Sequence, residues 1–168
     1  MTDSDNLQQV SSQTAEAAPP AGIYTRRFGV PADAIDVNGH VNNLAYVAWM
    51  QDVAIEHSAA AGWPMERYKE IGAGWVVRSH FVEYLRPAFA GDRIAAHTWV
   101  PQFTQRSTPR RYLFVRESDR QLLAQAETRW VFIDLATGRR RPLPDDLLAS
   151  FVVMPDEAEV RREVGLAR

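Results

Sequence analysis

One stretch of the chain has a clear helical pattern of apolar and polar positions. Apolar side chains recur there every three to four residues, over about twenty residues, which indicates one face of an amphipathic α-helix. Asn42 or Asn43 supplies a good N-cap, because a carboxamide accepts from a first-turn N–H. Gly62 followed by Trp63 and Pro64 is typical of a helix end. The predicted apolar stripe consists of Tyr46, Met50, Val53 and His57, with Val47, Ala54 and Ala61 beside it.

Elsewhere the apolar positions alternate with a period of two, which is typical of β-strands. The connections between these segments are short, and short connections favour antiparallel neighbours in a meander. One long helix packed against such a sheet predicts an α+β domain. The predicted strands span residues 23–28, 75–86, 93–100, 111–117 and 122–133, with residues 105–109 as a polar break.

The 168 residues fit a single domain with room for a substantial core. Residues 1–22 are rich in Ser, Gln, Ala and Pro, a composition that predicts a disordered N-terminal tail. The domain itself is predicted over residues 23–151, with a short helix at 145–151. Residues 152–168 then form a C-terminal extension that we expect to contain a further short helix.

Composition and charge exclude several classes of function. The net charge of −2 gives no reason to expect binding to nucleic acid or to a membrane. The absence of cysteine excludes disulfides and thiolate chemistry, and the four histidines lack metal-ligand spacing, so no metal site is expected. No apolar run approaches the ~20 residues of a membrane span, and the N-terminus does not resemble a secretory signal. We therefore expect a cytoplasmic protein.

The densest group of polar side chains, DVNGHVNN at residues 36–43, lies directly before the predicted helix. It combines an acid, an imidazole and three carboxamides with a helix N-terminus, which offers unpaired N–H groups and the positive end of the helix dipole. Such a group is suited to carbonyl chemistry. The alternative is structural, since Asp36 is also a residue type that forms turns.

Several segments together resemble the hotdog-fold acyl-CoA thioesterases of the 4-hydroxybenzoyl-CoA thioesterase group. They are the loop at 36–43, VEYLRP at 82–87 followed by Gly91 and Asp92, TRWVFID at 128–134, TGR at 137–139, and Leu143 with Pro144. The resemblance runs from about Tyr24 to Phe151, and the loop is also similar to that of plant-type acyl-ACP thioesterases.

The resemblance implies a hotdog fold, in which a curved antiparallel sheet of about five strands wraps one long central helix. It implies a homodimer, or a homotetramer, with sheets joined edge to edge and active sites between subunits. It also implies that Asp36 is the catalytic carboxylate. Many relatives carry a pair of glutamates in the helix and an arginine soon after, where this chain has Gln51, Asp52 and Ala54, so more of the chemistry would depend on Asp36.

Under this hypothesis Asp36 either activates water or attacks the thioester directly. Backbone N–H groups near Asn42 and Asn43 would polarise the carbonyl. His40 is expected to bond Asp36 or the substrate, or else to cap the loop, and Asn38 to orient Asp36 or else to form the turn. For the Asn42 and Asn43 side chains, helix capping is favoured over a direct catalytic role.

The helix would also contribute to substrate binding, with Tyr46 and Met50 expected to line the acyl pocket or else to belong only to the core. Arginine supplies nearly all cationic groups, because Lys69 is the only lysine. Guanidinium groups bind phosphate through two hydrogen bonds at once, so we expect some arginines to hold the CoA phosphates. A solvated surface is the alternative. The candidates are Arg106, Arg110 and Arg111, or the run at 139–141.

The prediction is an acyl-CoA thioesterase that hydrolyses its substrate to a free acid and CoA, with no retained cofactor. A second hypothesis is a hotdog hydratase or dehydratase acting on enoyl thioesters through an Asp36 and His40 pair. A third is an acyl-CoA-binding module without catalysis, because a fold does not fix a function.

Overall fold

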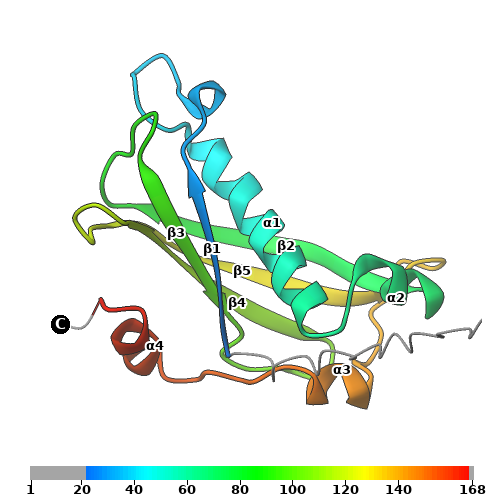
Figure 1. Ribbon diagram of the computed structural model, residues 1–168. Coiled ribbons are helices and arrows are strands. Elements are labelled where there is room, and N and C mark those ends of the chain that lie inside the picture. Colours follow the sequence, from blue (N-terminus) through cyan, green and yellow to red (C-terminus); the bar gives the residue numbers. More distant parts are fainter. Residues whose placement is uncertain (1–21, 167–168) are drawn as a thin grey trace, which may run out of the picture.

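The structure is a computed structural model that describes residues 22–166. It contains one five-stranded antiparallel sheet, one long helix and several short helices (Figure 1). The elements are β1 (Ile23–Gly29), the 3-10 turn η1 (Ala32–Ala34), α1 (Asn43–Ala60), α2 (Met65–Glu70), β2 (Ala73–Tyr84), β3 (Arg93–Trp99), β4 (Ser107–Arg116), β5 (Leu122–Asp134), α3 (Asp145–Ala149) and α4 (Glu157–Glu163).

The strand order in the sheet is β1-β3-β4-β5-β2. Strands β3, β4 and β5 form the expected meander, but β2 does not pair with β3, so a meander of all the later strands was a wrong prediction. Instead β2 lies beside β5 at the far edge, with Ala73 opposite Asp134 and Tyr84 opposite Ala124. Strand β1 occupies the other edge, beside β3. The long helix therefore connects two strands at opposite edges of the sheet.

Helix α1 lies along one face of the curved sheet (Figure 1) and buries the face that the sequence predicts. Its buried side chains are Tyr46, Met50, Val53, Ala54 and His57, which confirms the predicted stripe. Its N-cap is Asn42, whose Oδ1 accepts from the Leu44 N–H at 2.8 Å. The main core forms where this stripe packs on sheet residues such as Phe114 and Ile94.

Strand β2 is an edge strand whose side chains are largely exposed along most of its length. Several of these are apolar, namely Val76, Val77, Phe81 and Tyr84. A bulge between Val77 and Ser79 interrupts its register with β5. A long edge strand with exposed apolar side chains is an open site for pairing with another strand.

The C-terminal segment packs against the sheet. Val160 of α4 is fully buried in a small cluster with Trp99 and Leu113. Arg111 pairs with Glu157, also from α4, at 2.9 Å. A short helix therefore does occur in the extension at 152–168. The predicted disordered tail at 1–22 lies outside the described residues, apart from Gly22.

Strand β4 begins earlier than predicted, because residues 107–109 belong to it and not to a polar break. Pro109 is tolerated there even though it cannot donate a backbone hydrogen bond. The segment between α1 and β2 contains helix α2. No helix among the described residues is long and apolar enough to cross a membrane.

Candidate active site

The loop before α1 folds back on itself in a narrow turn that holds Asp36 in place. The Asp36 N–H donates to the His40 carbonyl at 2.9 Å, and the Gly39 N–H donates to the Asp36 carbonyl at 3.0 Å. Gly39 has a φ of 82°, a conformation that L side chains rarely adopt. The turn is closed by a bridge between Ile35 and Val41. The position of Asp36 is therefore fixed by main-chain hydrogen bonds.

The Asp36 carboxylate is partly engaged within this turn. Its Oδ1 accepts from the Asn38 N–H at 2.8 Å, as in an Asx turn. Its side chain is 22% exposed, and no described residue donates a hydrogen bond to Oδ2. The structural and catalytic interpretations of Asp36 are thus compatible, because one oxygen holds the turn while the other stays available.

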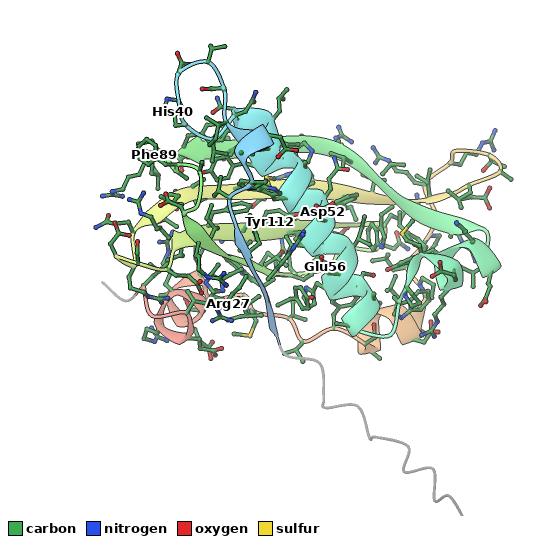
Figure 2. The ribbon with its side chains drawn as sticks, turned by 45° about the horizontal axis from the view of Figure 1, so that its top comes forward. Arg27, His40, Asp52, Glu56, Phe89 and Tyr112 are labelled. Carbon is green, nitrogen blue, oxygen red and sulfur yellow. The ribbon has the colours of Figure 1, made fainter. Side chains whose placement is uncertain are left out.

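His40 and Asn38 are close to Asp36 in different ways. His40 Nδ1 lies 3.8 Å from Asp36 Oδ1, which is too long for a hydrogen bond but allows an ion pair when the imidazole is charged. Asn38 contributes its main-chain N–H to Asp36. Figure 2 shows His40 on the loop that projects beyond the first turn of α1. The catalytic roles expected for both residues stay predictions.

The start of α1 supplies main-chain donors beside this loop. Asn42 is occupied as the N-cap, which agrees with the capping interpretation. The Asn43 N–H has no acceptor among the described residues, as is usual for the first positions of a helix. The Asn43 carbonyl accepts from the Tyr84 hydroxyl at 3.0 Å, which ties the helix start to the end of β2.

Tyr46 and Met50 occupy the main core and do not line any of the cavities described below. Tyr46 stacks edge-on with Trp49, Tyr84 and Phe114, and burial raises its pKa to about 12. Met50 is fully buried. Within the described chain both residues therefore belong to the core, and a place on an acyl pocket between subunits stays a prediction.

A large cavity lies at the opposite end of α1 from Asp36. Its volume is about 450 Å³, within the range of small-molecule sites. We call it the aromatic cavity, lined by Trp63, Tyr68, Trp75, Phe103, Trp130 and Arg110 among others. Because α1 has 18 residues, the two ends are separated by about 27 Å. Within one chain, the polar loop therefore lies before the first turn of α1, whereas the cavity lies beside the helix from Gln51 onward.

Arg110 lies at the wall of the aromatic cavity and is only 6% exposed. Its Nη1 donates to His57 Nδ1 at 2.7 Å and to Thr98 Oγ1 at 3.4 Å. A guanidinium has no acceptor, so His57 Nδ1 must be unprotonated. His57 is itself buried, as its place on the apolar stripe of α1 requires. Burial lowers the pKa of the Arg110 guanidinium.

Arg110 and Arg111 do not form a joint phosphate site, which corrects the prediction for this pair. Neighbouring residues of a strand point to opposite faces of the sheet. Arg110 therefore faces α1, whereas Arg111 pairs with Glu127 and Glu157 on the other face.

Arg106 instead lies with arginines from three other segments. They line a second cavity of about 530 Å³, which we call the arginine cavity, formed by Arg78, Arg106, Arg129 and Arg140 with neutral residues between them. None of its lining residues is an aspartate or glutamate. The two regions of arginines singled out in the sequence, around 106 and at 139–141, meet here. Of the latter run, Arg141 instead donates to the Ile71 carbonyl.

A family model identifies the chain. The model of the thioesterase-like superfamily matches residues 30–151, which is most of the described chain. The chain belongs to the thioesterase-like superfamily. Membership confirms the family resemblance and the predicted enzyme class, a thioester hydrolase. Comparison with curated proteins gives no significant sequence match.

Solved structures confirm the hotdog fold expected for this superfamily. A 1,4-dihydroxy-2-naphthoyl-CoA thioesterase from Synechocystis superposes with a TM-score of 0.71 at 20% identity, covering 77% of this chain and 95% of its own. A hypothetical protein from Staphylococcus aureus, solved in complex with CoA, gives 0.73 at 17% identity, covering 81% and 85%. A probable thioesterase from Escherichia coli gives 0.65 at 23% identity, covering 75% and 94%.

Proposed function

We propose that this member of the superfamily is an acyl-CoA thioesterase that converts an acyl-CoA and water to a free acid and CoA. The observation that carries the proposal is the pairing of a fixed carboxylate with an unused main-chain donor. Asp36 keeps Oδ2 available, and the adjacent helix start presents the Asn43 N–H. Asp36 would act as base or nucleophile, while the N–H and the helix dipole would stabilise the oxyanion.

The proposed active form is a homodimer joined through β2. Strand β2 is an unpaired edge with exposed apolar side chains, and a two-fold axis lets such a strand pair with its own copy in antiparallel fashion. Pairing along the whole strand would set Ala73 opposite the partner's Tyr84. The first residues of β2 in one protomer would then lie beside the last residues of β2 in its partner.

This pairing would complete the site. One end of β2 contributes Gly74 and Trp75 to the aromatic cavity. The other end, at Tyr84, is bonded to the start of α1, next to the Asp36 loop. The dimer would therefore bring the aromatic cavity of one protomer to the Asp36 loop of its partner. Ile55 and Met65 at the cavity rim and Leu44 beside the loop are exposed apolar residues suited to such a contact.

The CoA phosphates would bind at the arginine cavity. Phosphate groups are bound most strongly by guanidinium forks, and four arginines line this cavity, of which Arg129 also pairs with Glu127 at 3.7 Å. Arg106 keeps its predicted role in this proposal, with Arg140 as a second contributor. CoA is then part of the substrate, and the proposed chemistry needs no resident cofactor.

Replacing Asp36 by Asn tests the proposal most directly. The variant keeps the Asx turn, because the carboxamide oxygen still accepts from the Asn38 N–H, but it loses the base or nucleophile. We expect kcat for CoA release to fall by about a hundredfold or more, with the circular dichroism spectrum unchanged. The assay follows released thiol over a panel of acyl-CoAs.

The matched control is Asp33→Asn, in the exposed turn η1 a few residues before the loop. Its kcat should equal that of the wild type. An Asp36→Asn enzyme with full activity would remove Asp36 as the catalytic carboxylate. A wild-type protein that releases no CoA from any acyl-CoA of the panel would overturn the proposed function.

A further inference from the structure

The aromatic cavity contains a buried cation, Arg110, that no carboxylate of the described residues neutralises. Among residues 22–166, Arg110 has no ion pair with an aspartate or glutamate, and none of the residues lining the cavity is acidic. Burying an unpaired charge is costly, and proteins normally pair such charges. Its neighbours His57 and Thr98 are neutral acceptors, and the Phe151 ring lies 5.9 Å from its Cζ.

Arg110 also has hydrogen-bonding capacity left over. A guanidinium carries five N–H donors, and its hydrogen bonds to other described residues use only Nη1. Nε and Nη2 form no hydrogen bond to another described residue. Since these two nitrogens form one edge of the planar fork, they present the pair of parallel donors that a carboxylate accepts.

Three other polar side chains of the cavity wall bond one another, whereas the buried indole nitrogens of Trp63 and Trp130 have no hydrogen-bond partner among the described residues. Ser58 Oγ donates to the Trp63 carbonyl at 2.8 Å, so the Tyr68 hydroxyl donates to Ser58 over 2.7 Å. The Trp75 indole N–H in turn donates to Tyr68 at 3.1 Å. These contacts use the Ser58 and Tyr68 hydroxyl protons, and Arg110 is the one buried charged side chain among the described lining residues.

We infer that the aromatic cavity binds acyl groups that carry a carboxylate at the end remote from the thioester, and that Arg110 is the residue that recognises this carboxylate. The inference rests on the proposed thioesterase function and specifies its substrate class. Apolar walls would hold the methylene chain, and the guanidinium would neutralise the terminal charge. A site built to bond a polar group discriminates strongly against the analogue that lacks it, because its own polar group is then left unpaired.

The experiment compares acyl-CoAs of equal length that differ only at the remote end. Adipoyl-CoA and hexanoyl-CoA form one pair, and suberoyl-CoA and octanoyl-CoA form a second. We expect the wild-type kcat/KM to favour the carboxylated member of at least one pair by about tenfold or more, the range expected for a hydrogen-bonded charge. A preference for the methyl-terminated member in both pairs, or equal values, would overturn the inference.

Arg110→Met should reverse the preference, because an apolar side chain of similar length then faces the terminal group. Arg110→Lys keeps the charge without the fork and should retain part of the preference, which covers the case of a poorly folded Met variant. The matched control is Arg93→Met, an exposed arginine at the start of β3, which should behave as the wild type.

Binding without turnover separates this inference from the proposed function. Trp63, Trp75 and Trp130 line the cavity, so their fluorescence reports occupancy. Hexanoate should bind at least about tenfold more tightly than 1-hexanol to the wild type, and this difference should vanish in Arg110→Met. If no thioester is hydrolysed but this difference is found, the catalytic proposal fails and the recognition site stands. Equal binding of both compounds by the wild type refutes the recognition site.

Discussion

His97 shows how one buried side chain makes the stability of this protein depend on pH. It lies in β3, and its Nδ1 is 2.8 Å from the Thr25 hydroxyl. Burial, followed by the positive charges of Arg27 and Arg120, lowers its pKa to about 4. The folded protein therefore holds His97 neutral over a range in which the unfolded chain would protonate it.

The direction of the pH effect follows from this shift. Between the unfolded value of 6.5 and the folded value of about 4, the unfolded state binds more protons. Stability is thus complete above pH 6.5 and falls as the pH drops toward 4. We expect His97 to contribute a loss of roughly 2 kcal/mol between pH 7 and pH 5. Urea unfolding at both pH values measures it.

His97→Gln removes the titrating group and provides the comparison. The variant should be less sensitive to pH by about the same 2 kcal/mol, whatever its absolute stability. The pKa of His80 is also lowered by burial, but this histidine is present in both proteins and cancels in the difference. Identical pH dependence in the two proteins would show that His97 titrates normally.

At the scale of residues, the sequence predicted interactions between near neighbours in the chain but not those between residues far apart. The cap at Asn42 and the stripe through Met50 depend on spacing within one helix, and both were predicted correctly. The bond between Arg110 and His57 joins positions far apart in the chain, so no local pattern in the sequence indicates it. Strand alternation would have predicted that Arg110 and Arg111 point to opposite faces of the sheet, if the predicted strand had begun at Ser107 as β4 does.

Among the elements, β2 has the most consequences for function. Its alternation was visible in the sequence, but its place beside β5 was not, because pairing between distant strands leaves no local signature. The same reason explains why the aromatic cavity was missed. It is assembled from α1, α2, β2, β4, β5 and the segment around Phe151.

Phe81→Glu tests the role of the β2 edge. Phe81 is 64% exposed in the single chain, so a charge there should leave the protomer folded. In the proposed dimer the new carboxylate would be buried against apolar side chains of the partner, which is costly. We expect a monomer in analytical ultracentrifugation and loss of acyl-CoA hydrolysis, although Asp36 is intact.

Val152→Glu is the matched control, because Val152 is 45% exposed and lies outside the sheet. It should remain dimeric and active. A Phe81→Glu protein that stays dimeric would show that another surface joins the protomers, and a fully active monomer would show that each chain contains a complete site.

At the scale of the whole molecule, α1 keeps two functional regions apart. The Asp36 loop lies before its first turn, and the aromatic cavity lies beside its last turns. Figure 2 shows Asp52 and Glu56 along the helix between these ends. They pair with Arg26 at 3.2 and 3.4 Å, so in the described chain the middle of the helix is tied to β1.

This separation predicts that two variants, each impaired toward a carboxylated substrate, can rescue one another. Asp36→Asn lacks the catalytic carboxylate, and Arg110→Met lacks the recognition group, so each homodimer has two defective sites for a carboxylated substrate. In a mixed dimer both lesions fall in the same site, and the other site is wholly wild type. Random exchange of subunits would then restore about a quarter of the normal number of working sites.

Unfolding and refolding the two variants together, against each refolded alone, measures this complementation with adipoyl-CoA. Recovery of hydrolysis only in the mixture would mean that each active site is built from residues of both protomers. No recovery would mean that both residues act within the same polypeptide. If hydrolysis does recover, the length of α1 has a genetic consequence, because two defective copies of the chain together would do what neither does alone.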